Sequence, residues 1–266
     1  MSRTTAADLG PQYENDEPFT RRVRLHQSWW RAEVLRLPFG VGPQARSKGK
    51  FGNMLVAEDG ARGANFLTPE VGEYALRRQS EFPRGIKKHR LLCNMLSSQP
   101  MCFNLFGPAA LADTISLSVV SALFDRRDLR RVVRVIVEHE PAPRVEHLSD
   151  ATSFDAFIEV EHERGDLGFV GIETKLTEPF SQNRYPITDG SGYRRWVEHA
   201  RAPWRVPSVA SLEAVEVNQL FRDHALAVAA RHRAGSPYKF GALAVVRHPD
   251  DPSCAASMAA FGKLVR

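Results

Sequence analysis

The stretch of sequence that decides the fold reads SFDAFIEVE at residues 153–161, HERGDL at 162–167 and GFVGIETK at 168–175. Apolar and polar residues alternate with a period of two in the first and third pieces, as they do in half-buried strands. The Arg164-Gly165-Asp166 triplet between them is typical of a tight turn. The sequence therefore predicts a β-hairpin, with strands at residues 154–161 and 167–176.

The turn sets the expected register of this hairpin. A three-residue loop at 164–166 pairs Glu163 with Leu167, and it puts Asp155 directly across from Lys175, one same-face step from Glu173. A slip of one residue would mix the two faces of the sheet. The face of the sheet that carries Asp155, Glu173 and Lys175, called the site face here, also holds Phe157, Glu159, Glu161, Phe169 and Gly171. The opposite face is almost wholly apolar and holds Phe154, Ala156, Ile158, Val160, Val170, Ile172 and Thr174. We expect two carboxylates and one ammonium at one end of the hairpin, about 5–8 Å apart across the strands.

Such a cluster suits hydrolysis of a phosphodiester. Two carboxylates can hold Mg²⁺, an ion that keeps several waters and takes a phosphate oxygen as a further ligand. The ion activates water, and a neighbouring lysine stabilises charge in the transition state. Because neighbouring acids repel each other, at least one of the two should have a raised pKa without metal, and Lys175 should oppose that shift.

The competing interpretation is an ordinary ion pair between Asp155 and Lys175 on an exposed sheet face. The use of basic residues argues against it, because the chain has 29 arginines and only 7 lysines. Lys175 is the only lysine between Lys88 and Lys239, and no other lysine has an acid two residues before it. The order of the predicted strands around the motif is also the one that the chemistry needs.

The rest of the chain predicts the elements around this hairpin. Helices are expected at residues 21–37, at 68–78 with Thr68 as the N-cap, at 109–124 and at 209–232. Strands are expected at 132–137 and 240–247, and the glycines and basic residues at 39–52 indicate a loop. The order of helix, three strands, helix and strand is that of an α/β fold with a mixed sheet.

In this layout the chain resembles the PD-(D/E)XK, or restriction-endonuclease-like, nuclease superfamily. The resemblance implies an αβββαβ core with a central mixed sheet at residues 91–266, after an N-terminal tail and helical extension at 1–90. It implies that Asp155 and Glu173 bind a metal together with the carbonyl of Thr174, and that Lys175 is the catalytic lysine. The implied cofactor is Mg²⁺, with Mn²⁺ as an alternative. Phe154 stands where many relatives have a proline.

The resemblance also directs attention to the helix after the hairpin. Many members carry a polar residue there, often Gln, and Gln219 is the candidate catalytic residue in this chain, with Arg222 one turn later. The alternative for both is a solvated helix face. Glu159 shares the site face, but it lies about 13 Å along the strand from Asp155 and is expected to be a surface acid.

Candidates outside this core are less distinct. Ser97, Ser98 and Gln99 could contact a phosphate, although a cap or loop role is the more ordinary interpretation. Glu73 or Asp113 could be the acid that some members add from the first helix, and the sequence does not choose between them.

Composition favours a polyanionic partner. The 266 residues carry a formal net charge of +5, with a pI of about 9.3, and such a balance is common in proteins that bind nucleic acid. Basic residues gather in four clusters, namely Arg21, Arg22, Arg24 and Arg31; Arg46, Lys48 and Lys50; Arg84, Lys87, Lys88 and Arg90; and Arg126, Arg127, Arg130 and Arg131. For any single cluster, a solvated surface is an equal alternative.

Two further observations bear on the setting. No segment approaches the roughly 20 apolar residues of a membrane span, and residues 1–18 do not resemble a signal peptide. Cys93, Cys102 and Cys254 form no CxxC pair, which argues against a disulfide framework and a zinc site. We expect a cytoplasmic protein without a membrane partner.

The leading interpretation is an endonuclease of a bacterial restriction or defence system that acts on double-stranded DNA, alone or as an oligomer. Its N-terminal extension, with Trp29 and Trp30 on one helix face, should pack on the core and contact DNA through its arginines. One alternative is an exonuclease or a nuclease acting on RNA. Others are a nucleic-acid-binding module with a degenerate nuclease fold, and an interaction protein that presents its tryptophans, Trp29, Trp30, Trp196 and Trp204.

Overall fold

The computed structural model describes residues 5–42, 49–124, 126–200, 202–205 and 209–266, so Arg46 and Lys48 of the second basic cluster lie outside it. Two compact units are present. Unit 1 comprises Met1–Leu111, Leu176–Glu178 and His248–Asp251, and unit 2 comprises Ala112–Lys175, Pro179–Arg247 and Pro252–Arg266. The division into an extension at 1–90 and a core at 91–266 stays a prediction.

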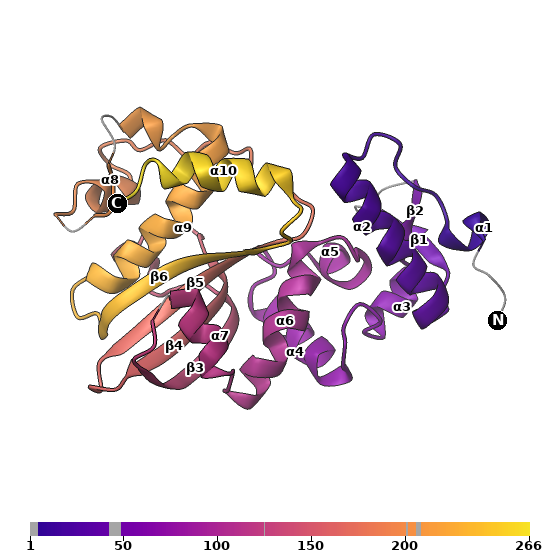
Figure 1. The fold of residues 1–266 in the computed structure, drawn as a ribbon, viewed down its shortest axis with the longest axis horizontal. Coiled ribbons are helices and arrows are strands. Elements are labelled where there is room, and N and C mark those ends of the chain that lie inside the picture. The colour runs from indigo at the N-terminus through magenta and orange to yellow at the C-terminus, as the bar shows by residue number, and fades with distance from the viewer. Residues whose placement is uncertain (1–4, 43–48, 125, 201, 206–208) are drawn as a thin grey trace. The chain divides into compact units, whose positions relative to one another are not determined.

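Unit 2 is built on a four-stranded mixed sheet (Figure 1). Its strands are β3 (Leu129–His139), β4 (Phe154–His162), β5 (Leu167–Lys175) and β6 (Tyr238–Arg247), in that spatial order. β4 pairs antiparallel with β3 and β5, and β5 pairs parallel with β6. The predicted mixed sheet is confirmed, with Asp155 on one strand and Glu173 on its antiparallel neighbour.

The register of the β4–β5 hairpin differs from the prediction by two residues. Ala156 pairs with Ile172 and Glu161 with Leu167, which sets Asp155 opposite Glu173 rather than Lys175. The loop still has three residues, but they are 163–165, because Gly165 has a φ of +85° and the last residue of such a loop is left-handed. A shift of two preserves the faces, so the expected grouping of side chains survives.

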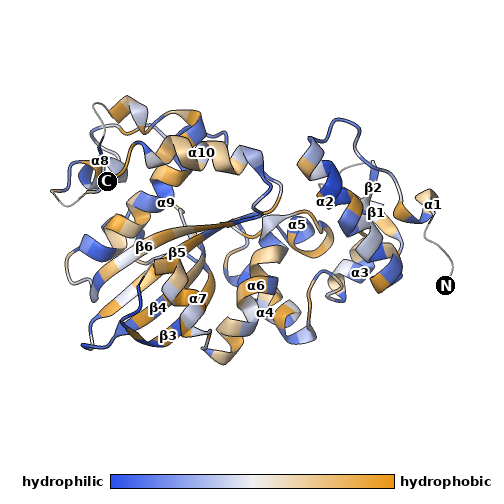
Figure 2. Ribbon diagram, viewed as in Figure 1, coloured by the Kyte–Doolittle hydropathy of each residue, from blue (hydrophilic) through white to orange (hydrophobic). Residues whose placement is uncertain are grey.

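Helices cover both faces of the sheet. On one face, α7 (Leu117–Phe124) contacts β3 and β6, with the rings of Phe124 and Phe240 5.7 Å apart. On the other face, α9 (Val215–His232) packs on β5 and β6. Figure 2 shows α7 as mostly hydrophobic, whereas the turn between β4 and β5 is hydrophilic. The short helices η2 (Arg144–Glu146), α8 (Gly192–Val197) and η3 (Val209–Ser211) and the C-terminal α10 (Pro252–Gly262) complete the unit.

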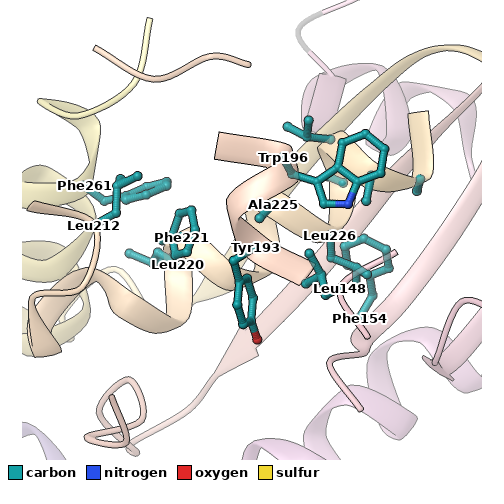
Figure 3. Packing of buried hydrophobic residues seen from close by; sticks show 14 of the residues in the cluster. Leu148, Phe154, Tyr193, Trp196, Leu212, Leu220, Phe221, Ala225, Leu226 and Phe261 are labelled. Carbon is teal, nitrogen blue, oxygen red and sulfur yellow. The ribbon is translucent and has the colours of Figure 1, made fainter. Parts of the chain in front are cut away.

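The core between α9 and the sheet is aromatic (Figure 3). Phe154 is one of its members, although alternation had placed it on the opposite face. Its ring lies 5.9 Å from that of Phe157 and 6.3 Å from that of Phe169. The space comes from Gly171, where a Cβ would lie 2.3 Å from the Phe154 ring. The predicted position of Phe154 was therefore wrong, because the alternation of β4 starts only after its first residue.

Unit 1 is mainly helical. Its helices are α1 (Ala6–Leu9), α2 (Pro18–Trp29), the π-helical η1 (Trp30–Leu35), α3 (Ala57–Ala61), α4 (Pro69–Glu81), α5 (Lys88–Cys93) and most of α6 (Ser98–Ala112). Thr68 caps α4 as predicted, since its hydroxyl accepts a hydrogen bond from the Val71 amide at 3.4 Å. Within the described part of the chain, no helix combines the length and apolar character of a membrane span.

Two predictions for helices and loops were wrong. Residues 39–52 are not simply a loop, because β1 (Phe39–Val41) and β2 (Lys50–Leu55) form an antiparallel pair. Its glycines serve close backbone approach, since a Cβ on Gly40 would lie 2.1 Å from the Leu55 carbonyl oxygen. The single helix expected at 109–124 is two helices, α6 and α7. The first ends before Asp113, whose φ of +45° is left-handed.

Candidate active site

Asp155 lies where β4 and β5 begin to separate. The ladder between the two strands ends at the pair of Ala156 with Ile172, and beyond it the Asp155 side chain takes the place of a backbone partner. Oδ2 of Asp155 accepts hydrogen bonds from the amide and the hydroxyl of Thr174, both at 2.7 Å. In a strand the amide and carbonyl of one residue point to the same side. The Thr174 carbonyl is therefore directed towards the β4 side of β5, where Asp155 lies.

Glu173 and Lys175 form a buried ion pair on the same strand. Nζ of Lys175 lies 2.8 Å from Oε1 of Glu173, and the two side chains are 9% and 6% exposed. The ammonium also lies 5.0 Å from the centre of the Phe180 ring. Phe180 follows the strand by five residues and so closes one side of the lysine. The pair is thus held inside the unit rather than on an exposed sheet face.

Gln219 on α9 joins the pair. Its Nε2 donates to Oε1 of Glu173 at 2.6 Å, and its Oε1 accepts from Nζ of Lys175 at 3.3 Å and from the Ser181 amide at 2.6 Å. One side chain therefore fixes the acid, the lysine and the loop after β5. Sequence reasoning had offered a solvated helix face as the alternative for Gln219, and these contacts exclude it.

The pKa values of Glu173 and Lys175 show that the two members of the pair differ in how firmly they keep their charge at neutral pH. Burial, with the charge of Asp155 adding to it, raises the pKa of Glu173 to about 7, although Lys175 opposes the shift. Burial alone would lower the pKa of Lys175, but the nearby Glu173, Asp155 and Asp223 charges outweigh it and raise that pKa. Lys175 therefore keeps its charge at neutral pH, while Glu173 is poised between its two states. The expected raised pKa of one acid is present.

Comparison with known proteins gives a family. A family model of the PD-(D/E)XK nuclease superfamily matches residues 14–266. The chain belongs to this superfamily. Neither the curated proteins nor the solved structures provide a match. Membership of the PD-(D/E)XK superfamily indicates a nuclease, and the match extends over nearly the whole chain, including most of unit 1.

One acid near this PD-(D/E)XK motif escaped the sequence analysis. Asp223 lies one turn after Gln219 on α9 and is 4% exposed. Its Oδ2 accepts no hydrogen bond from any described residue. Burial, together with the charge of Glu173, raises its pKa well above the ordinary value. The available signal was the four-residue spacing from Gln219, which puts both side chains on one face of the helix.

Arg222, the second candidate on this helix of the nuclease, has other partners. Its guanidinium donates to the hydroxyls of Tyr193 at 2.9 Å and Thr152 at 2.7 Å, and it lies 3.5 Å from Asp150. It also stacks over the Tyr185 ring, at 3.6 Å from the ring centre. These contacts tie α9 to the segments on either side of it, so Arg222 supports the helix that carries Gln219.

The remaining candidates have structural partners or exposed positions. Glu159 was wrongly expected at the surface, since it is buried and bound by Arg134 at 3.0 Å and by the Tyr238 hydroxyl at 2.8 Å. Glu73 and Asp113 are both exposed. Ser97 precedes α6, and Ser98 and Gln99 are its first two residues. All three have protein partners: Arg90 donates to Ser97, the Ser98 amide donates to Glu178, and Gln99 donates to the Gly85 carbonyl.

The oxygen atoms of Asp155, Glu173 and the Thr174 carbonyl fit a divalent cation that is held by few side chains. Within the described residues, no group of three or more His, Cys, Asp or Glu side chains is arranged to hold a metal ion. A PD-(D/E)XK site needs fewer, because Asp155 and Glu173 would share the ion with the Thr174 carbonyl. The buried Asp223 carboxyl has no hydrogen bond at Oδ2 from the described chain, and a cation bound nearby would favour its charged form.

Proposed function

We propose that this chain is a Mg²⁺-dependent endonuclease that hydrolyses phosphodiester bonds of double-stranded DNA. The observation that carries the proposal is the hydrogen-bonded group of Glu173, Lys175 and Gln219, with Asp155 close enough for its charge to act on Glu173 and Lys175. The two acids supply hard oxygen ligands for a metal ion, and the lysine keeps its positive charge at neutral pH. Gln219 holds Glu173 and Lys175 together.

Asp155, Glu173 and the Thr174 carbonyl would hold the metal. When bound, Mg²⁺ (or Mn²⁺) activates water and stabilises charge on the phosphate. Thr174 orients Asp155 through its amide and hydroxyl. Lys175 supplies positive charge to the phosphate in the transition state, and Gln219 keeps the ammonium beside Glu173. Phe180 excludes water from one side of the lysine.

Charge supports a nucleic acid substrate. The formal net charge is +5, and several exposed arginines lie in unit 1, among them Arg21 and Arg22 on α2. We propose that this unit contacts the DNA backbone, and that the protein acts in the cytoplasm as part of a restriction or defence system. Backbone contacts by arginine imply binding that weakens steeply with salt.

A binding module with a degenerate nuclease fold is the second candidate. It would have no reason to keep an acid and a lysine buried together, because burying a charged pair costs desolvation energy. The retained pair therefore favours an active enzyme over this candidate.

The test is cleavage of four substrates with Mg²⁺ and with EDTA. Supercoiled plasmid, linear duplex, single-stranded DNA and RNA are incubated with the purified chain. Nicked or linear plasmid that forms only with Mg²⁺ supports the endonuclease. Digestion of linear duplex alone would point to an exonuclease, and digestion of RNA alone to an RNA nuclease. Salt-sensitive DNA binding without any cleavage would favour the binding module.

A further inference from the structure

Unit 1 contains a cavity that the site around Asp155 does not use. Its volume is about 840 Å³, within the range of about 300–1,000 Å³ that small-molecule sites occupy. The lining comes from the segment before α2, from α2 and β2, from α5 and the residues after it, and from Thr177 and Glu178. All of these residues belong to unit 1. The cavity is therefore a feature of one compact body.

One side of the cavity is aromatic and apolar. The rings of Tyr13 and Phe51 lie 6.2 Å apart at 74° to each other, and Met54 and Leu96 form a buried apolar wall behind them. Arg24 already lies over the Phe51 ring, whereas Tyr13 is 45% exposed. Tyr13 therefore offers a ring on which a planar heterocycle can stack.

Some polar groups of the lining are already paired and make the wall rigid. Arg24 is bound by Asp16 and Asn53, each at 2.5 Å. Arg90 is bound by Glu178 at 2.9 Å and by Ser97 at 3.0 Å. Because Arg24 and Arg90 already have hydrogen-bond partners, they define the shape of the cavity and are not needed to bind a ligand.

Three polar groups in the lining remain available. Nε2 of His89, which donates or accepts according to the tautomer, is buried and has no hydrogen-bond partner in the described part of the chain. Nζ of Lys87 donates to the Arg84 carbonyl at 2.6 Å and has two further protons to give. The carboxamide of Asn94 accepts hydrogen bonds through Oδ1 from Asn53 and from the Leu96 amide, which leaves its NH₂ group for another acceptor.

The charge of the lining favours an anion. Arg24 is already paired with Asp16 and Arg90 with Glu178, so Lys87 leaves a formal balance of 3 − 2 = +1 with His89 neutral. Buried polar atoms generally have partners, and these available groups belong to residues that line the same cavity as an exposed aromatic ring. The complementary ligand has a planar ring with acceptor atoms and a negative charge.

We propose that this cavity binds a nucleotide. The base stacks on Tyr13 beside the apolar wall, with the NH₂ group of Asn94 within its reach, and the phosphate is held by Lys87 and His89. Such a nucleotide is either free or one unpaired unit of a nucleic acid chain, since both present the same base and phosphate. The site lies outside the Asp155 group, so it does not depend on the nuclease chemistry.

The experiment measures binding to the full chain in EDTA, where metal-dependent cleavage does not interfere. The first arm titrates the common nucleoside 5′-monophosphates and inorganic phosphate. The second arm titrates a short single-stranded oligonucleotide and the same oligonucleotide with abasic sites. Lys87→Ala removes the phosphate contact, and Tyr13→Ala removes the stacking ring. Lys88→Ala is the matched control, because Lys88 is an exposed neighbour that does not line the cavity.

We expect each of the two cavity variants to weaken binding about tenfold or more, with Lys88→Ala unchanged and Tyr13→Phe close to the original protein. If the monophosphates show this pattern, the ligand is a free nucleotide. If only the intact oligonucleotide shows it, the ligand is one nucleotide of a nucleic acid strand. The proposal is overturned if neither ligand depends on Tyr13 and Lys87. It is equally overturned if inorganic phosphate binds as tightly as the monophosphates, or if abasic sites leave oligonucleotide binding unchanged when monophosphates do not bind.

Discussion

Gln219 donates a hydrogen bond of 2.6 Å to Oε1 of Glu173, the same oxygen that Nζ of Lys175 approaches to 2.8 Å. A helix residue thus holds in place an acid 46 residues earlier and a lysine 44 residues earlier, both on one strand. Both partners of Gln219 are buried, so its amide has no water to compete with it on that side. The orientation of the Glu173–Lys175 pair depends on this contact.

Replacing Gln219 with Ala should lower the rate of DNA cleavage about 10- to 100-fold, the usual cost of losing a group that orients catalytic ligands. The midpoint of thermal unfolding should fall only slightly, because Glu173 and Lys175 keep each other as partners. Glu216→Ala, on the exposed side of the same helix, is the control and should cleave normally. A Gln219→Ala protein with the original rate would remove Gln219 from the site.

The stability of the metal-free protein should fall as the pH rises from about 4.5 to above 7. The pKa of Glu173 is raised from 4.5 to about 7 in the folded state. The folded protein therefore binds a proton more tightly than the unfolded chain, and this stabilisation is lost as the pH passes through 7. The loss is at most about 3 kcal/mol. Urea unfolding in EDTA between pH 4.5 and 8.5 measures it, and Glu173→Gln should flatten the curve. An equally steep curve for Glu173→Gln would assign the effect to other groups.

Replacing Asp223 with Asn should leave the protein as stable as before at pH 8, or more stable by about 1 kcal/mol. The raised pKa of this buried carboxyl means that its charged form costs stability at high pH, and the amide has the same shape without the charge. Asp166→Asn in the exposed turn is the control. A clear loss of stability in Asp223→Asn would show that the carboxylate is bonded.

Replacing Arg222 with Ala should destabilise the fold by about 2–4 kcal/mol, because it leaves Asp150 and the Tyr193 and Thr152 hydroxyls without their shared donor. Cleavage per folded molecule should stay close to the original, since Arg222 contacts none of the four site residues in the described hydrogen bonds. Lys at this position should not restore stability, because it lacks the planar fork. Urea unfolding and the rate at low urea separate the two effects, and a loss of rate without a loss of stability would make Arg222 part of the site.

The sequence predicted the parts of this protein that follow a local period. Apart from Phe154, β4 and β5 alternate, so the two strands and the shared face of Asp155, Glu173 and Lys175 could be inferred. The register could not, because it depends on which residue of the turn takes the left-handed conformation, and Gly165 does so one position earlier than expected.

Long-range packing accounts for what the sequence concealed. Asp223 looks like any polar residue of a helix, and only the structure shows it buried against the hairpin. Gly40 and Gly52 read as loop residues, yet each allows another backbone to approach within 2.1 Å of where a Cβ would stand. Pro108 suggests a helix break, but it lies inside α6. At Asp223, Gly40 and Gly52, contacts distant in sequence override the local signal.

The central claim is that Lys175 acts on the phosphate beside the two acids, and a comparison of cleavage with binding tests it most directly. Single-turnover cleavage of plasmid DNA with Mg²⁺ and DNA binding in EDTA are measured for the original protein, Lys175→Ala and Asp155→Asn, with the exposed Lys239→Ala as the control. We predict that both site variants bind DNA but cleave at least about 1,000-fold more slowly, and that Lys239→Ala is unaffected. Cleavage at the original rate by a folded Lys175→Ala or Asp155→Asn protein would contradict the account.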